Sequence, residues 1–297
     1  MLYGLIFTSA LTVDGIARPV EQCRAGWESG QQVFVSQDAV CIMGPIRPGA
    51  EEIVESGLIG ENPRSVIVVN SRGGDVRVAL PIGEMISGYE ISLVVDGYCL
   101  SSCANYILPA AKYKYILNDA IVGWHGGPPR TVDEYARAMQ ATRPELSRKE
   151  AFSIADKEFP PIREIIQRQN DLYAKAGASP KIMYDLSVAF RCITGKSKNE
   201  LLGIAQRARN EFWSPGPVTL MSHYGISNFI RLDAGHGRLS GDTIHVMWED
   251  GGSADFAVDN VCLYEGFAER DIREEYAARA PRIDAPISEW LALPEVQ

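Results

Sequence analysis

Short apolar runs alternate with helically spaced apolar residues through the middle of the chain. The runs predict strands at residues 32–35, 39–43, 65–70, 91–95, 113–117 and 121–124. Helical spacing predicts helices at residues 49–58, 76–87 and 101–111. The run at 65–70 is almost continuously β-branched, which is typical of a parallel strand covered on both faces. This alternation predicts an α/β fold with a largely parallel sheet.

The pattern changes after residue 125. Helical spacing dominates at residues 132–139, 149–176, 182–190 and 199–209, and Pro160-Pro161 is expected to interrupt the second of these helices. Residues 243–249 and 254–258 then predict a β-hairpin, joined by an Asp-Gly-Gly-Ser turn. A helix is expected at 271–279. The first thirteen residues form an apolar run that is too short to span a bilayer, and both a signal-peptide core and a buried first strand remain open for it.

Composition narrows the function classes. Of 297 residues, 46% are hydrophobic and 23% charged, which is typical of a folded globular protein. The net charge of -9 argues against nucleic acid as a partner. Cys99 and Cys103 have no second pair at ligand spacing, and His223, His236 and His245 are scattered, so no metal site is expected. Dinucleotide, P-loop and GxSxG motifs do not occur in the sequence.

Two junctions between a predicted strand and a predicted helix contain candidate chemistry. In the first, Gly73-Gly74 follows the strand at 65–70, so that backbone amides and the next helix N-terminus can face an anion. A tight turn is the simpler interpretation. In the second, Ser101-Ser102 opens a helix, where one serine alone is usually an N-cap. His125 ends a later strand, and parallel topology brings such strand ends to one edge of the sheet.

These three elements, in this order, resemble a known family. Asn70-Ser71-Arg72-Gly73-Gly74, then Cys99-Leu100-Ser101-Ser102-Cys103, then a strand ending in His125 are similar to the serine peptidases of the Clp protease proteolytic subunit type, within the crotonase-like fold. More closely, they resemble the exported bacterial relatives called ClpP-like periplasmic proteins. The resemblance covers residues 39 to about 226. It implies repeated β-β-α units with a largely parallel sheet in a ClpP/crotonase-like domain at 33–227, an N-terminal segment at 1–32, and an extension with a β-hairpin at 228–297.

The resemblance also implies roles for individual residues. Ser101 matches the nucleophile, His125 the general base, and Gly74 and Ser102 the backbone donors of an oxyanion hole. Asp185 matches the third member of the triad, although a second alignment places Asn210 there. Asp185 is favoured because a carboxylate can also stabilise the imidazolium electrostatically. The implied activity is that of a serine peptidase without a cofactor, acting on a peptide or protein substrate. A homo-oligomer and an exported, periplasmic location are implied too, while membrane association is left open.

Three alternatives remain open on the sequence. The fold would also suit an enzyme for acyl-CoA thioesters, or a scaffold protein without catalytic activity. A serine–lysine mechanism would use Lys149 or Lys157 as the base.

Cys99 and Cys103 are either a disulfide beside the nucleophile or buried thiols, and export would favour the disulfide. The pairing of the other cysteines, Cys192 and Cys262 among them, is not deducible from the sequence.

Overall fold

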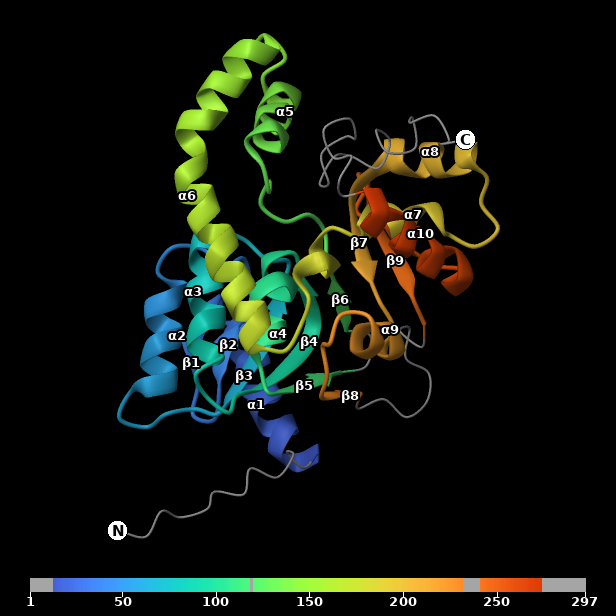
Figure 1. Cartoon of the computed structure of the whole chain (residues 1–297). Helices are drawn as coiled ribbons and strands as arrows, with labels where there is room; N and C mark the ends of the chain where they lie inside the picture. Colours follow the sequence, from blue (N-terminus) through green and yellow to red (C-terminus); the bar gives the residue numbers. More distant parts are fainter. Residues whose placement is uncertain (1–12, 118–119, 232–240, 274–297) are drawn as a thin grey trace. The chain divides into compact units, whose positions relative to one another are not determined.

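The computed structural model describes residues 13–117, 120–231 and 241–273, and Figure 1 shows the chain. Contacts between Cα atoms divide the chain into two units. Unit 1 comprises residues 1–122 and 227–238, and unit 2 comprises residues 123–226 and 239–297. The apolar run expected to be a signal peptide or a first strand lies, up to residue 12, outside the described residues.

Unit 1 is built on a largely parallel sheet. Its strands are β1 (Val33–Val35), β2 (Val40–Ile42), β3 (Val66–Ser71), β4 (Ser92–Leu100), β5 (Tyr113–Ile116) and β8 (Phe229–Arg231), together with β6 (Ile121–Gly123), whose last residue is the first of unit 2. They follow the order β1-β2-β3-β4-β5-β8, with β6 pairing β4. The strands from β2 to β8 along this order run parallel to their neighbours, and β1 is antiparallel to β2. This topology confirms the predicted α/β class and is consistent with a ClpP/crotonase-like fold.

Helices cover both faces of this sheet. They are α1 (Val13–Glu28), α2 (Ala50–Ile59), α3 (Val76–Ile86), the π-helix η1 (Cys103–Ile107) and α4 (Leu108–Ala110). Because side chains alternate along a strand, Cys41 and Val68 face Ile16 of α1 in one apolar cluster. Val40, the neighbour of Cys41, faces the opposite side and packs closely on Gly57 of α2. Figure 1 shows α2 and α3 side by side. The unbroken apolar runs of the inner strands reflect burial on both faces.

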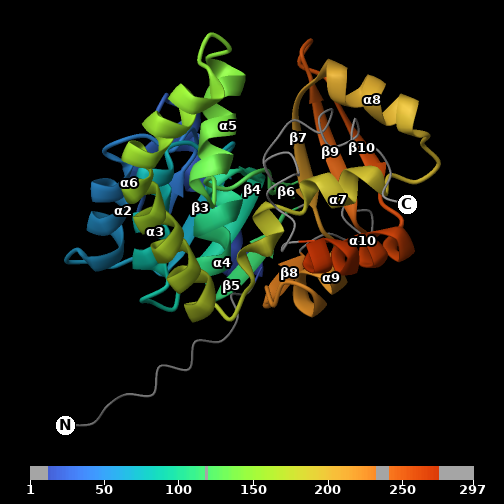
Figure 2. The same cartoon turned by 45° about the horizontal axis from the view of Figure 1, so that its top comes forward.

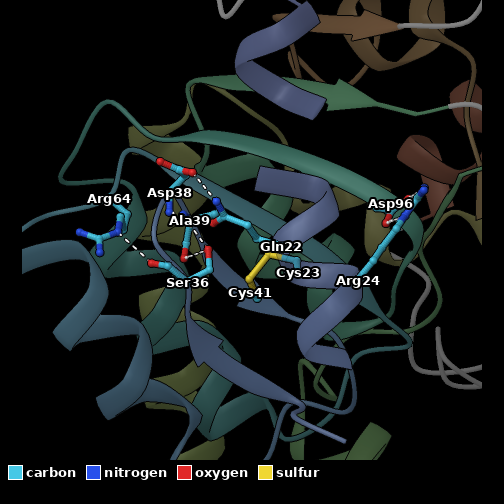
Figure 3. The surroundings of a disulfide bond; sticks show 9 residues. All are labelled: Gln22, Cys23, Arg24, Ser36, Asp38, Ala39, Cys41, Arg64 and Asp96. Carbon is cyan, nitrogen blue, oxygen red and sulfur yellow. Dashed lines mark hydrogen bonds and ion pairs between the residues drawn. A yellow bond between two sulfur atoms is a disulfide. The ribbon is translucent and has the colours of Figure 1, made fainter. Parts of the chain in front are cut away.

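Helix α1 is fastened to the sheet by a covalent bond and by charge. Cys23 forms a disulfide with Cys41 of β2 (Figure 3). The next residue, Arg24, donates two hydrogen bonds, of 2.6 and 2.8 Å, to the carboxylate of Asp96 in β4. Charged hydrogen bonds of this forked kind are stronger than neutral ones. Residues 13–28 are therefore part of the fold of unit 1, and the domain boundary at residue 33 stays a prediction.

Unit 2 combines a small antiparallel sheet with helices. Strands β7 (Ala208–Ser214), β9 (Thr243–Trp248) and β10 (Ser253–Ala257) follow the order β10-β9-β7. The helices are α5 (Val132–Thr142), α6 (Arg148–Lys175), the 3-10 helix η2 (Pro180–Met183), α7 (Leu186–Arg191), α8 (Lys198–Arg207), α9 (Pro217–Ser222) and α10 (Asn260–Arg273). Figure 2 shows α7 crossing the sheet, in agreement with its contacts to β7 and β9. Among the described helices of the whole chain, none is long and apolar enough to cross a membrane.

Two expectations for unit 2 were wrong in detail. The helix predicted to be interrupted at Pro160-Pro161 runs unbroken from Arg148 to Lys175. Each proline removes one backbone donor, but Ala155 before them and Tyr173 after them are fully buried, and this packing stabilises the helix on both sides of the prolines. The helix expected at 199–209 ends at Arg207, and β7 begins in its place. The predicted hairpin is present as β9 and β10, while most of the helix expected at 271–279 lies outside the described residues.

Candidate functional site

In unit 1, Ser101 lies directly after the end of β4. Its φ is 54°, in the left-handed region, and Asn228 is the other non-glycine residue with positive φ in the part of the chain that the structure describes. A side chain in this region costs on the order of 1–3 kcal/mol, so the surrounding contacts must hold it there. One of them is a 2.7 Å hydrogen bond from the Asn105 amide to the Ser101 carbonyl. The chain then enters the π-helix η1, a form that often occurs at functional sites.

The Gly-Gly loop after β3 packs against this serine. A Cβ on Gly73 would lie 2.7 Å from the Leu100 carbonyl oxygen and 2.8 Å from both Ser101 Cβ and Ser102 N. Since real Cβ atoms do not approach so closely, only glycine fits there. Gly73 also has φ +89°, which glycine adopts without strain. The two sequence motifs are therefore in direct contact.

Backbone bonds on both sides of Gly74 fix the loop. The Ile46 amide donates to the Gly73 carbonyl at 3.0 Å, and the Asp75 amide donates to the Ile46 carbonyl at 2.9 Å. Between them, the Gly74 amide donates to none of the residues that the structure describes. Ser102 stands at the N-cap of η1, where backbone amides have no partner within the helix. These are the two amides expected to act as oxyanion donors.

The side chains of Ser101 and Ser102, the two adjacent serines of the second motif, differ in burial and in hydrogen bonding. Ser102 is 2% exposed, and its hydroxyl donates a 2.8 Å hydrogen bond to the Gly74 carbonyl. Ser101 is partly exposed, and no hydrogen bond engages its hydroxyl among the described residues of unit 1. Ser102 therefore connects the two loops, while the Ser101 hydroxyl makes no such bond to the described residues of unit 1.

The other polar residues of the first motif have structural roles. Asn70 Oδ1 accepts a 3.1 Å hydrogen bond from the Tyr98 amide, joining the ends of β3 and β4. Ser71 Oγ accepts a hydrogen bond from the Gly73 amide. Asp75 caps α3 by accepting from the Arg77 amide, and its ion pair with the Arg77 guanidinium lowers the pKa of the carboxyl. The polar side chains of residues 70–75 thus form hydrogen bonds that fix the conformation of this loop.

A disulfide closes the segment that contains Ser101. Cys99, near the end of β4, is bonded to Cys103, the first residue of η1, and both are fully buried. Of the two alternatives that the sequence left open for this pair, the structure has the disulfide. Cys192 and Cys262 form a third disulfide, in unit 2, so all six cysteines are paired and none offers a free thiolate to a metal.

His125 belongs to unit 2. The Trp124 backbone, just before it, exchanges hydrogen bonds of 2.7 and 2.8 Å with Trp213 of β7. The imidazole meets the Phe212 ring edge to face, with centroids 4.9 Å apart, and forms no hydrogen bond to the described residues of unit 2. Burial lowers the pKa of His125, because it disfavours the charged imidazolium. A neutral imidazole is the form that accepts a proton.

Asp185 is a buried carboxylate in the same unit. It is 4% exposed and accepts a 2.9 Å hydrogen bond from the Tyr224 hydroxyl. Trp213 donates in turn to the Tyr224 oxygen at 3.2 Å, which connects Asp185 to β7, the strand beside His125. No sequence motif assigned a role to Tyr224 or Trp213. The signal that could have pointed to them is the pair of segments Phe212-Trp213-Ser214-Pro215 and Tyr224-Gly225-Ile226, on which the alignment that selects Asn210 is based.

The rival candidates lie elsewhere in unit 2. Asn210 is in β7 opposite Met247 of β9, where the strand register shifts. Lys149 and Lys157 are both exposed on α6. Within the described ranges, no group of three or more His, Cys, Asp or Glu side chains could hold a metal ion. His223 stacks on Phe267 and His245 pairs with Asp255, whereas His236 lies outside the described residues.

The candidate residues divide between the two units. In unit 1 the structure brings Gly74, Ser101 and Ser102 together. In unit 2 it connects both His125 and Asp185 to β7, His125 through the Phe212 ring and Asp185 through the Tyr224 hydroxyl. The joint action of these two groups stays a prediction.

Comparisons with known proteins add a distant likeness. No protein-family model matches the chain, and no curated protein sequence does either. Among solved structures, it is similar to a ClpP1 mutant from Listeria monocytogenes, with 21% sequence identity and a TM-score of 0.37. The match covers 66% of this chain and 92% of that chain. The fold assignment rests on the sheet topology described above.

Proposed function

We propose that the chain is a serine hydrolase acting on peptide bonds. In this mechanism Ser101 Oγ attacks the carbonyl carbon while His125 accepts the hydroxyl proton, which it then donates to the leaving amine. Asp185 stabilises the imidazolium electrostatically. Water, deprotonated by His125, then attacks the acyl-enzyme and releases the acid together with free Ser101. No cofactor takes part.

The backbone of Ser101 carries this proposal. A serine with φ 54° between a buried parallel strand and a short helix is strained. Strained strand-to-helix turns present the nucleophilic serine in other hydrolases. Helix capping alone does not explain this backbone, because N-cap residues adopt an extended conformation without such strain.

The surrounding groups support the other roles. The unbonded Gly74 amide and the N-terminal amide of Ser102 are suited to a developing oxyanion, where each such donor contributes about 3 kcal/mol. Burial keeps the His125 pKa below its ordinary 6.5, so at neutral pH the imidazole is a base. Among the two serines, Ser101 is favoured because the Ser102 hydroxyl is bonded to the Gly74 carbonyl.

The test is labelling with a fluorophosphonate probe, followed by peptide mapping. We expect the label on Ser101, and we expect Ser101→Ala and His125→Ala each to lower the labelling rate at least a thousandfold. Ser102→Ala is the matched control, since it removes a neighbouring hydroxyl and keeps the backbone amide. It should retain labelling within about tenfold.

Two outcomes would contradict the proposal. Absence of labelling in the folded wild-type chain would favour the scaffold or the acyl-CoA enzyme, which both leave the serine unreactive. Labelling that survives His125→Ala but is lost in Lys149→Ala or Lys157→Ala would favour a serine–lysine mechanism.

Location and assembly extend the proposal. Three disulfides are typical of oxidising compartments, which supports an exported, periplasmic location. Homo-oligomerisation rests on the sequence resemblance and is tested by sedimentation velocity, where a purely monomeric chain at micromolar concentration would contradict it.

A further inference from the structure

The Cys99–Cys103 disulfide closes a segment of five residues with Ser101 at its centre. One end of the segment belongs to β4 and the other is the first residue of η1. Both cysteines are fully buried, so the bond is part of the core of unit 1. The chain reverses from strand to helix inside this small ring.

This disulfide differs from the other two in what it connects. Cys23–Cys41 and Cys192–Cys262 join residues 18 and 70 positions apart. Cys99 and Cys103 are only 4 positions apart. A cross-link restricts the unfolded chain more when its loop is longer, so the shortest of the three contributes least to global stability by this route. Its effect must be sought in the local conformation.

The local conformation is the strained one. Ser101 is held at φ 54° from two sides, by the close approach of Gly73 and by the hydrogen bond from the Asn105 amide. The disulfide adds a covalent constraint to these contacts, because it ties the residue two before Ser101 to the residue two after it.

We infer that the Cys99–Cys103 disulfide is a positioning element for the nucleophile. It keeps the Ser101 backbone left-handed and thereby holds Oγ and the Ser102 amide in the arrangement needed for acylation. Without the cross-link, Ser101 can relax to negative φ, which moves its hydroxyl away from the reactive position. This inference rests on the proposed function, since it assigns the disulfide to the acylation step of the same serine.

The experiment compares two disulfide deletions under one probe. Cys99→Ala/Cys103→Ala removes the bond around Ser101, and Cys192→Ala/Cys262→Ala removes the longest-range bond of the chain as the matched control. Each variant is titrated with the fluorophosphonate to separate the maximal rate of labelling from the half-saturating concentration. Circular dichroism and thermal melts establish that each variant is folded at the assay temperature.

We expect the maximal labelling rate of Cys99→Ala/Cys103→Ala to fall at least tenfold, with the half-saturating concentration changed less than twofold. The control should keep both parameters within twofold even though its melting temperature falls further. A merely structural disulfide would give the opposite order, because the variant that loses more stability would also lose more reactivity.

Equal labelling of wild type and Cys99→Ala/Cys103→Ala would overturn the inference and leave the proposed function intact. No labelling of the oxidised wild type would refute the proposed function, and the inference with it. If Cys99→Ala/Cys103→Ala does not fold, Cys99→Val/Cys103→Ala refills part of the buried volume and is held to the same tenfold criterion.

Discussion

The two units hold their candidate residues by different means. In unit 1, the backbone does the positioning. Ser101 is strained, Gly73 fits against it without room for a Cβ, and a disulfide closes the segment. In unit 2, side chains do it, since His125 rests on the Phe212 ring and Asp185 on the Tyr224 hydroxyl. In unit 1 the positioning acts on main-chain atoms of two loops that pack directly on each other, whereas in unit 2 it acts through the side chains of Phe212 and Tyr224.

The largest expected effect concerns the acid of unit 2. Asp185→Asn should lower the rate of fluorophosphonate labelling about a thousandfold, because the neutral amide no longer stabilises the imidazolium. Asn210→Ala is the matched control and should stay within threefold of wild type. The reverse pattern would make Asn210 the third member of the triad, and the hydrogen bond from the Tyr224 hydroxyl to Asp185 would then have no part in catalysis.

The next effect concerns the backbone of unit 1. Gly73→Ala should lower labelling about a hundredfold, because the added Cβ displaces Leu100, Ser101 or Ser102. Gly30→Ala is the matched control, since Gly30 has nearly the same φ, +90° against +89°, but nothing within 4 Å of the added carbon. Both variants carry the φ strain, and only the first has the clash. Equal losses in the two would mean that strain alone, and not contact with the serine, explains the effect.

The pH dependence of the labelling rate tests whether burial in unit 2 lowers the pKa of His125. Burial lowers the pKa of His125 below 6.5, so the neutral base persists to lower pH than in an exposed histidine. The acid limb of the labelling rate against pH should therefore have its midpoint below 6.5. Phe212→Ala, which opens one side of the ring to water, should move the midpoint upward. A wild-type midpoint above 6.5 would contradict burial as the controlling influence.

The smallest effect is on stability and involves Glu211 of β7. Burial raises its pKa to about 7, from 4.5. Between these two values the folded state holds a proton that the unfolded state has lost, so wild-type stability falls as pH rises from about 4.5 to 7. Glu211→Gln stays neutral and should be more stable than wild type at pH 8 by on the order of 2 kcal/mol, with little difference at pH 4.

Chemical denaturation at both pH values measures the stability effect of Glu211. The exposed Glu249→Gln, on the turn between β9 and β10, is the control and should change the free energy of unfolding by no more than about 0.5 kcal/mol at either pH. A gap between Glu211→Gln and wild type that is the same at pH 4 and pH 8 would show that the carboxyl is not desolvated in the folded chain.

The sequence predicted much of unit 1 because its elements are encoded locally. The run at 65–70 became β3, and the Gly73-Gly74 and Ser101-Ser102 junctions lie where the pattern placed them. The left-handed backbone of Ser101 was not predictable, because serine has no preference for it and only tertiary contacts maintain it. The disulfide at Cys99 was one of two open alternatives, since spacing alone does not distinguish it from buried thiols.

Unit 2 was harder to predict for the same reason that its site is harder to assign. Residues 208–214 begin with Ala-Arg-Asn-Glu and continue a helical pattern, yet they form β7 by pairing with β9 and with Trp124. Pairing energy of this kind overrides local preference. The same pairing brings Trp213 to Tyr224, and hence a hydrogen bond to Asp185, which no local pattern reveals.

The disulfide pattern has a consequence for how the chain is made. Six cysteines can be joined in 15 ways. In the structure, cysteines that are neighbours in sequence order are bonded to each other: the first to the second (Cys23–Cys41), the third to the fourth (Cys99–Cys103) and the fifth to the sixth (Cys192–Cys262). A polypeptide that is oxidised while it emerges from its N-terminus always offers the correct partner first. Such a chain can mature under a simple oxidant, without an isomerase to reshuffle wrong pairs.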